Sequence, residues 1–258
     1  MPELIEVELY RSAADALIGR TIVDVPLVDQ LLLRELPAAA LVDGLVGRTV
    51  VAACRHGKVL LLDLDVGGPL ALRFGMTGRL IVDGEAPISA LLYSPYREDP
   101  RWDRLVVELE GGGSMRLSDP RRLGGIALDP DLSRLGPDAT TITAAELGAA
   151  LSGDVALKAR LLDQHRIAGI GNLICDETLW RACLSPARPA WSLDPDDVGA
   201  LRRTIRSTVR TLTRRGGSHT GDLQAERHRE GRCPRCGEPL ARDVIGTRTT
   251  YWCRAEQR

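Results

Sequence analysis

The hydrophobic pattern of this chain changes from that of strands to that of helices in the stretch 129–138, and that change limits the folds that the chain can adopt. Before this stretch, short segments rich in valine, leucine and isoleucine are separated by turn residues such as Gly57 and the glycines at 111–113. Such spacing predicts the strands of an antiparallel β-sandwich or barrel. The expected strands lie at 21–25, 48–54, 58–65, 70–74, 79–83, 104–110 and 114–119.

After the stretch 129–138, which holds two prolines and three aspartates, the apolar residues follow a helical period. Asp194 and Pro195 form an N-cap and first-turn pair, and Gly216 is a helix stop. Helices are therefore expected at 144–151, 156–164, 173–183 and 195–215.

The N-terminus carries residues suited to covalent chemistry. The apolar residues that follow Glu3 recur at three- and four-residue spacing, which predicts a helix that ends near Gly19. Removal of the initiator Met1 leaves Pro2 with a free secondary amine, which can attack an aldehyde-like carbon and form an iminium ion. Glu3 is then a neighbouring carboxylic acid placed to move protons. These residues alone leave open an ordinary amphipathic helix with no chemical role.

Charge is distributed unevenly along a chain whose net charge is only −1. Residues 201–258 hold 14 arginines, no lysine and six acidic residues, a net charge of +8, so residues 1–200 carry −9. A cationic face can follow the phosphates of a nucleic acid, although a solvated basic helix gives the same count. Only two of the 34 basic residues are lysines, Lys58 and Lys158, and each is a candidate for chemistry that needs an amine or a compact charge.

The sequence contains no secretory signal and no apolar run of membrane-spanning length, so we expect a cytoplasmic protein with no membrane partner. Three of the six cysteines are clustered near the C-terminus, at Cys233, Cys236 and Cys253. In a reducing compartment such a cluster favours a metal site over a disulfide framework.

The opening Met1-Pro-Glu-Leu-Ile-Glu-Val-Glu8 resembles that of the formamidopyrimidine-DNA glycosylase and endonuclease VIII family of bacterial DNA repair enzymes. The resemblance implies that Pro2 is the nucleophile on the deoxyribose C1′ and that Glu3 is its acid/base partner. Glu6 is implied as a supporting carboxylate. The commonest opening in the family has proline where this chain has Ile5.

Two loops resemble the family's wedges, which fill the gap left when a base is turned out of the duplex. In the segment 73–78, Arg-Phe-Gly-Met-Thr-Gly, the resemblance implies that Met76 enters the duplex; a buried core methionine is the alternative. In the segment 119–124, Asp-Pro-Arg-Arg-Leu-Gly, it implies that Arg121 reaches the orphaned base and that Arg122 binds a phosphate. Leu123 is implied as a wedge where the formamidopyrimidine branch usually has phenylalanine.

Two further motifs match positions of the family that bind the DNA backbone. Lys58, expected at the start of a strand, matches a lysine that reaches the active site and contacts the phosphate of the damaged nucleotide. The segment 163–172, Asp-Gln-x-x-x-Ala-Gly-Ile-Gly-Asn, matches the helix-two-turn-helix signature, which implies that Asn172 binds phosphates flanking the lesion and that Lys158 supports the same strand. Backbone N–H groups at such a helix N-terminus form an anion site.

The C-terminal cysteines resemble three quarters of a zinc ribbon, because Glu256 stands where the family has its fourth cysteine. A structural Zn²⁺ could be completed by Glu256, His219 or His228, and a hairpin without metal is the alternative. Arg248 in this hairpin matches the family's arginine that holds the phosphates at the lesion.

The connection after Gly217 is shorter than in formamidopyrimidine-DNA glycosylases, where it includes a loop that closes over 8-oxoguanine. Recognition of 8-oxoguanine is therefore in doubt, and ring-opened purines such as formamidopyrimidine, oxidised pyrimidines or abasic sites become more plausible substrates.

The resemblance implies an α+β protein with three parts. Residues 1–130 are expected to form an N-terminal antiparallel β-sandwich with the N-terminal helix, residues 131–222 a helix-two-turn-helix DNA-binding domain, and residues 223–258 a zinc-finger-like β-hairpin. The implied protein is a monomeric bifunctional DNA glycosylase and AP lyase of base excision repair, associated with the bacterial nucleoid, that acts on double-stranded DNA with oxidised bases or abasic sites. An endonuclease VIII-like enzyme for oxidised pyrimidines and a non-catalytic damaged-DNA-binding protein are the alternatives.

Overall fold

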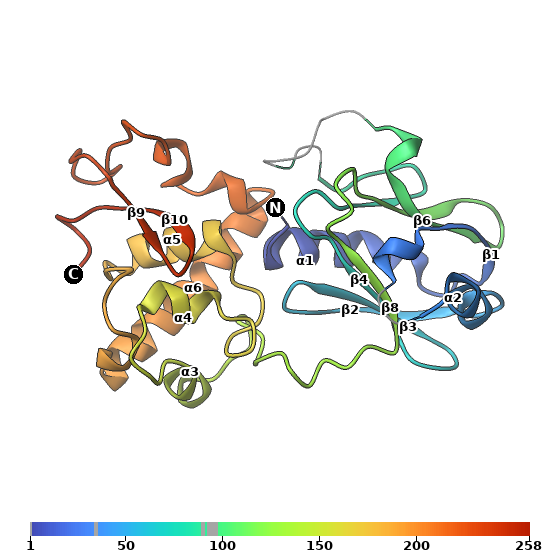
Figure 1. The fold of residues 1–258 in the computed structure, drawn as a ribbon, viewed down its shortest axis with the longest axis horizontal. Coiled ribbons are helices and arrows are strands. Elements are labelled where there is room, and N and C mark those ends of the chain that lie inside the picture. Colours follow the sequence, from blue (N-terminus) through green and yellow to red (C-terminus); the bar gives the residue numbers. More distant parts are fainter. Residues whose placement is uncertain (1, 34–35, 89–90, 92–97) are drawn as a thin grey trace. The chain divides into compact units, whose positions relative to one another are not determined.

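A computed structural model describes residues 2–33, 36–88, 91 and 98–258 of the chain (Figure 1). These residues form two compact units. The first contains Pro2 and Glu6–Leu132, and the second contains Glu3–Ile5 and Ser133–Arg258. None of the helices in the described part of the chain is long and apolar enough to span a membrane. The expected removal of Met1 concerns a residue outside the described ones.

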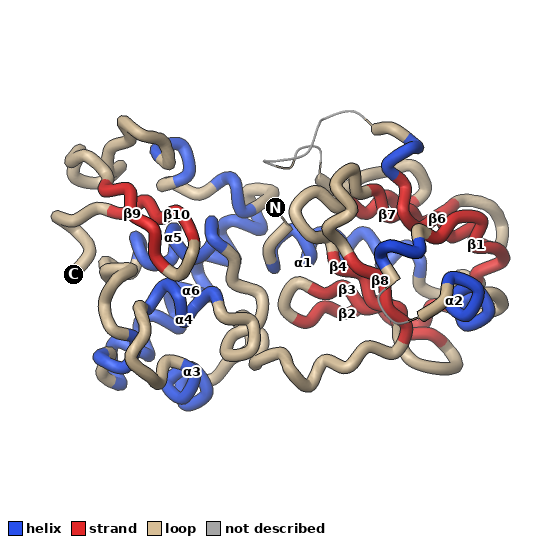
Figure 2. The backbone as a smooth tube through the Cα atoms, in the orientation of Figure 1, coloured by secondary structure: helices blue, strands red, loops and turns tan. Residues whose placement is uncertain are grey.

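The first unit is built on two antiparallel four-stranded sheets (Figure 2). One sheet has the strand order β1-β6-β7-β5 and the other β2-β3-β4-β8. Their strands are β1 (Ile22–Val28), β2 (Val50–His56), β3 (Val59–Leu64), β4 (Leu70–Arg73), β5 (Arg79–Val82), β6 (Asp103–Leu109), β7 (Ser114–Ser118) and β8 (Gly125–Leu128). All seven strands expected from the sequence are present, so the predicted sandwich is confirmed.

The structure adds two elements that the periodicity did not predict. Strand β8 holds only four residues and is fixed by its pairing with β4, where Ile126 lies opposite Leu72. Helix α2 (Ala38–Leu45) buries Leu41 and Leu45. Both elements are too short for their own pattern to separate them from loops, and their packing partners lie elsewhere in the chain.

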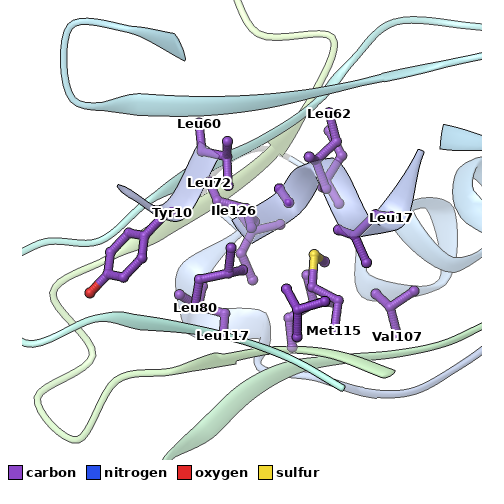
Figure 3. Close-up of a cluster of buried hydrophobic side chains, with 14 of the residues drawn as sticks. Tyr10, Leu17, Leu60, Leu62, Leu72, Leu80, Val107, Met115, Leu117 and Ile126 are labelled. Carbon is purple, nitrogen blue, oxygen red and sulfur yellow. The ribbon is translucent and has the colours of Figure 1, made fainter. Parts of the chain in front are cut away.

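The core of the first unit lies between its sheets and includes residues of the N-terminal helix α1 (Leu4–Ala14) (Figure 3). Tyr10 of α1 stacks at 4.4 Å on Phe74, the only phenylalanine of the chain, and its hydroxyl donates to the carbonyl of Gly78 at 3.1 Å. Burial raises the pKa of Tyr10 far above its ordinary value, so the phenol stays neutral. Other core residues are Leu17, Leu60, Leu62, Leu72, Leu80, Val107, Met115, Leu117 and Ile126.

The second unit contains four helices: α3 (Ala144–Ala150), α4 (Leu157–Leu162), α5 (Asn172–Arg181) and α6 (Pro195–Arg214). All four match predicted segments. Asp194 caps α6 by accepting from the N–H of Asp197 at 2.8 Å, and Gly216 follows the helix with φ of +94°, a conformation that favours glycine. Leu4 and Ile5 are fully buried in the same core as Ile174, Leu201 and Ile205.

A C-terminal hairpin of β9 (Ala241–Ile245) and β10 (Arg248–Trp252) belongs to this second unit. Its turn residues, Gly246 and Thr247, both have positive φ, as in the type I′ turn that suits a two-residue hairpin. The hairpin region has a small core of its own, made by Trp180, Leu223, Cys233, Leu240 and Cys253. Sheets, helices and this cysteine-bearing hairpin together confirm the α+β prediction.

Candidate active site and nucleic-acid interface

The N-terminus of helix α5 holds the carboxylate of Glu3. The N–H of Leu173 donates to Oε1 of Glu3 at 2.8 Å, and the N–H of Ile174 donates to Oε2 at 3.1 Å. Glu3 is fully buried, and the positive end of the helix stabilises its negative charge. The sequence predicted an anion site at this helix, and in the structure these two donors bind a carboxylate of the protein itself and not an external phosphate.

Gly171 makes this arrangement possible. A Cβ atom at Gly171 would lie 2.1 Å from Cδ of Glu3, so a side chain at this position would displace the carboxylate. The N–H of Leu4 donates to the carbonyl of Gly169 at 3.2 Å and fixes the chain next to Glu3. The Gly-Ile-Gly motif indicates a place where the backbone is approached closely. A role for Gly171 was not predicted, because the carboxylate that approaches it lies about 170 residues away in sequence.

Lys158, predicted as a supporting residue, is fully buried. Its Nζ lies 2.6 Å from Oδ1 of Asp176 and donates to the carbonyl of Thr249 at 3.2 Å. The side-chain amide of Asn172 donates to the same carbonyl, also at 3.2 Å. Arg227 completes the network by an ion pair with Asp176. Lys158 and Asn172 thus meet at the backbone of the hairpin, next to the predicted Arg248.

Arg248 itself is exposed at the start of β10. The adjacent turn lies against α4, because a Cβ at Gly246 would come within 2.8 Å of the Cβ of Ala159. The carbonyl of Thr249, one residue after Arg248, is the acceptor shared by Lys158 and Asn172. The structure therefore brings Lys158, Asn172 and Arg248 into one region of the second unit.

Glu177 is a second buried carboxylate of α5 with no predicted role. It accepts from the backbone N–H groups of Asp222 at 3.1 Å and Leu223 at 2.9 Å, and from Nε of Arg181 at 2.7 Å. It therefore anchors the end of the short connection after Gly217. The pair Asp176-Glu177 was noted as part of the signature, but its partners could not be deduced from the sequence.

The two predicted wedge loops of the first unit are joined by Asp119, which is fully buried. Its carboxylate accepts from the hydroxyl of Thr77 in one loop and from the N–H of Leu123 and Gly124, both at 2.8 Å, in the other. The loops are in backbone contact, since a Cβ at Gly75 would lie 2.4 Å from the carbonyl of Leu123. Asp119 was quoted in the motif without a role, and it is the residue that sets the shape of both loops.

The predicted wedge residues differ in exposure. Leu123 is 47% exposed, so its side chain is accessible to a bound molecule. Met76 is half-buried, so the alternative of a fully buried core methionine does not apply, and Nη1 of Arg121 lies 3.7 Å from its sulfur. Arg122, with φ of +53°, donates from Nε to Asp29 at 2.7 Å. Although burial works against it, this contact helps to hold the pKa of Asp29 below its ordinary value.

Lys58 is half-buried in the turn between β2 and β3. It was predicted at the start of a strand, and β3 begins at the next residue, Val59. Gly57 supplies the positive φ that a two-residue turn needs. Arg55 anchors the turn, because it donates to the carbonyl of Gly57 at 2.9 Å and to Glu8 of helix α1 at 2.9 Å. The turn with Lys58 is therefore tied to the helix that starts just after Pro2. Glu6, the predicted supporting carboxylate, is buried on the same helix.

Cys233, Cys236 and Cys253 form the one group of potential metal ligands in the described part of the chain, with ligand atoms all within 4.8 Å of one another. Burial opposes ionisation of Cys233, but hydrogen bonds from Trp180 and from the N–H groups of Cys236 and Arg235 lower its pKa to about 7. Because their ligand atoms lie this close together, the three cysteines fit a Zn²⁺ ion. The proposal that Glu256, His219 or His228 supplies the fourth ligand is not supported, because none of them belongs to the group.

An open groove of about 620 Å³ lies elsewhere, between α3 and the first turn of α6. Its lining, which includes Ala145, Ala149, Trp191 and Val198, has no titratable side chain. Proton transfer needs such a group, so the groove lining offers no acid or base for catalysis.

The chain combines a β-sandwich, a helix pair with a glycine turn and a cysteine-bearing hairpin. Its similarity to known families assigns it to the class of DNA glycosylases with AP lyase activity that act in base excision repair. The profile of the formamidopyrimidine-DNA glycosylase N-terminal domain matches residues 1–126, and that of the H2TH domain of the same enzymes matches residues 130–223. This chain belongs to the formamidopyrimidine-DNA glycosylase family.

Individual relatives agree with this assignment. The chain is 36% identical to the formamidopyrimidine-DNA glycosylase of Roseiflexus sp. (strain RS-1) and 35% identical to that of Rhizobium etli (strain CIAT 652), with 100% of each chain covered. The crystal structure of the MutM (Fpg) protein of Thermus thermophilus has a TM-score of 0.79 at 31% identity and covers 99% of this chain and 98% of its own. The Lactococcus lactis Fpg (MutM) complex with a Fapy-dG-containing DNA has the same fold, with a TM-score of 0.82 at 24% identity, covering 99% of this chain and 100% of its own.

Proposed function

We propose that this protein removes ring-opened purines such as formamidopyrimidine from double-stranded DNA and then cuts the strand at the abasic site. Membership of the family over the full chain supports the class of reaction. The observation that carries the proposal for this chain is the carboxylate of Glu3, held on two N–H groups of α5 directly after Pro2. The short connection after Gly217 favours ring-opened purines over 8-oxoguanine.

The chemistry follows from a secondary amine beside a fixed carboxylate. Glu3 accepts the proton of the Pro2 ammonium, and the freed nitrogen attacks C1′ of the deoxyribose. The bond between C1′ and the base breaks, and the base leaves with a proton. The C1′–O4′ bond of the sugar then opens, O4′ takes a proton, and an iminium forms between C1′ and the nitrogen of Pro2. The iminium makes a C2′ proton acidic; loss of that proton breaks the C3′–O bond, and a second elimination breaks the C5′–O bond. Water finally hydrolyses the iminium and frees the amine. The amine accepts the electrons throughout, so these steps consume no cofactor.

The DNA contacts divide between positioning and gap filling. Lys58, Arg122, Asn172 and Arg248 hold backbone phosphates, and Lys158 fixes the hairpin backbone next to Arg248. Turning a nucleotide out of the duplex costs a few kcal/mol of stacking free energy unless the vacated space is filled. The side chains that fill this space are those of Met76, Arg121 and Leu123.

The organisation that goes with this function has three parts. Residues 1–130 carry the catalytic residues, residues 131–222 form the helix-two-turn-helix domain, and residues 223–258 form the finger. A Zn²⁺ ion held by Cys233, Cys236 and Cys253 stabilises the finger. The protein acts as a monomer in the cytoplasm, on the DNA of the nucleoid.

The two alternatives receive less support. The matched family and relatives bear the formamidopyrimidine name, which does not favour an endonuclease VIII-like preference for oxidised pyrimidines. Binding of a duplex needs no acid/base group beside an amine, so the carboxylate of Glu3 next to Pro2 favours catalysis over binding alone.

Borohydride trapping tests the proposal. The full chain without Met1 is mixed with a duplex that carries one abasic site, reduced, and examined for a covalent adduct that mass spectrometry assigns to Pro2. Pro2→Gly tests the secondary amine itself, because it leaves only a primary α-amine at the same position. Gly171→Ala should displace Glu3 and lower the rate of trapping by about 100-fold or more, which is the size of one acid/base contribution.

The matched control is Gly148→Ala. Gly148 lies in α3, where an added Cβ meets nothing within 4 Å, so trapping at the wild-type rate is expected. A wild-type protein that binds the duplex and has lost Met1, yet gives no adduct, would leave a damage-binding protein and reject the catalytic function.

A further inference from the structure

Glu256, which replaces the fourth cysteine of the ribbon, is engaged elsewhere. Its Oε2 lies 3.2 Å from Nη1 of Arg235, and its carboxylate is outside the group formed by the three thiols. The side chain of Glu256 is therefore turned toward a guanidinium, although its position in sequence is that of a ligand.

Arg235 has several partners besides Glu256. Its guanidinium lies 4.1 Å from the ring centroid of Trp180 and donates to the Trp180 carbonyl. The same group reaches the sulfur of Cys183 at 2.9 Å. Because the guanidinium is planar and already has these partners, little further conformational entropy is lost when it also pairs with Glu256. This ion pair would have to break before Glu256 could bind a cation.

The three cysteines, in contrast, are prepared as ligands. The N–H groups of Arg235 and Cys236 point to the sulfur of Cys233, and those of Ala255 and Glu256 point to the sulfur of Cys253. The sulfurs of Cys236 and Cys253 are 3.5 Å apart. The ligand atoms of all three cysteines lie within 4.8 Å of one another, close enough to share one ion.

Two other residues near the end of the chain with ligand-type atoms, Gln257 and His228, are engaged in other contacts. Gln257 follows Glu256 in sequence, but its Oε1 accepts from the N–H of Cys253 at 2.8 Å and its Nε2 donates to the carbonyl of Leu184 at 2.9 Å. His228 is exposed and lies 3.8 Å from Glu226.

We propose that Cys233, Cys236 and Cys253 bind a soft divalent metal through three thiolates only, and that Arg235 keeps the fourth coordination position open to a small exchangeable ligand. Zinc in structural sites is almost always four-coordinate, so water, or an added imidazole or thiol, takes that position. This inference rests on the assignment of the finger to a metal site in the proposed function. It makes the metal of this finger accessible from solution, unlike that of a closed four-cysteine site.

Metal binding by the full-length protein tests the proposal. Zn²⁺ is titrated in competition with a colorimetric chelator, and Co²⁺ is used as a visible-absorbing probe, with wild type, Glu256→Gln and Glu256→Cys. One equivalent should bind to each. Glu256→Gln should bind Zn²⁺ within threefold of wild type, and Glu256→Cys at least tenfold more tightly, because only the latter adds a ligand.

Added imidazole distinguishes a metal with an open coordination position from a metal whose four positions are all filled by the protein. Millimolar imidazole should change the visible spectrum of the Co²⁺ forms of wild type and Glu256→Gln, and should leave that of Glu256→Cys unchanged. A tenfold or greater loss of Zn²⁺ affinity in Glu256→Gln would make Glu256 a ligand and overturn the proposal, as would wild-type protein that binds no Zn²⁺ at micromolar concentration. Borohydride trapping on the same samples reports the lyase separately, so failure of the metal proposal is distinguishable from failure of the proposed function.

Discussion

Asp119 in the first unit and Asp176 in the second are both buried carboxylates that organise predicted DNA-contacting residues, but their partners differ in kind. Asp119 accepts from neutral donors, the hydroxyl of Thr77 and the N–H groups of the 121–124 loop. Asp176 pairs with two cations, Lys158 and Arg227. Loss of the charge of Asp119 therefore leaves no cation without its partner, whereas loss of the charge of Asp176 leaves two. The two carboxylates should therefore respond differently to the same substitution.

The largest effect is expected from Asp176→Asn. The change leaves Lys158 and Arg227 buried without their counter-charge, and breaking a buried pair in this way costs about 3–5 kcal/mol. Chemical denaturation of the full chain, followed by tryptophan fluorescence, measures the loss. Glu230→Gln, a neutralised carboxylate on an exposed residue of the same unit, is the control and should change stability by less than about 0.5 kcal/mol. A loss below about 1 kcal/mol for Asp176→Asn would mean that the two cations find other partners.

Asp119→Asn should cost less, about 1–3 kcal/mol, because it removes acceptor capacity from neutral donors and strands no charge. Its effect on DNA chemistry should exceed its effect on stability, since it frees both wedge loops. Trapping on an abasic duplex should therefore slow at least tenfold while most of the protein remains folded. Asp43→Asn, on the exposed surface of α2, should alter neither quantity. Equal effects of the two substitutions on trapping would argue that the shape of the loops is not set by Asp119.

Substitution of two glycines by alanine distinguishes the effect of the contact between the wedge loops on stability from the effect of backbone strain. Gly75 has φ of +54° and its Cβ would lie 2.4 Å from the backbone of Leu123, whereas Gly19 has φ of +83° and its Cβ would meet nothing within 4 Å. Gly19→Ala should cost about 1 kcal/mol from strain alone. Gly75→Ala should cost about 1–3 kcal/mol more, from overpacking. Equal losses in thermal unfolding would show that the wedge loops separate freely.

The smallest effect concerns pH. Hydrogen bonds from Arg215, and charge interactions with Arg181, hold the pKa of Asp222 below its ordinary value, against the effect of burial. A carboxyl whose folded pKa is depressed adds stability above its unfolded pKa, near 3.9, and loses it as pH falls through the folded pKa. Because its side chain is 42% exposed, the contribution should be below about 1 kcal/mol. Asp222→Asn should therefore lower stability at pH 7 by that amount, and the loss should shrink as pH falls below about 3.9; a loss that does not change with pH would assign the effect to packing.

Much of the secondary structure could be predicted from the sequence because its causes are local. Alternating apolar segments specified the strands, and the N-cap Asp194 with Gly216 specified the ends of α6. Strand β8 and helix α2 were missed because each is defined mainly by partners in other segments. The strand that carries Lys58 was predicted to begin at that residue, but β3 begins at Val59 and Lys58 lies in the turn, whose geometry depends on the backbone of Gly57.

The sequence by itself determined which residue types are present at each motif: the amine of Pro2, the wedge loops, the glycine turn before Asn172 and the three cysteines. Tertiary structure alone decided what those residues contact. It placed Glu3 on the N–H groups of α5, joined the wedge loops through Asp119 and turned Glu256 toward Arg235. The physical reason is that a hydrogen bond or ion pair depends on distance in space. The partners of these buried charges lie up to about 170 residues apart, so no local pattern records them.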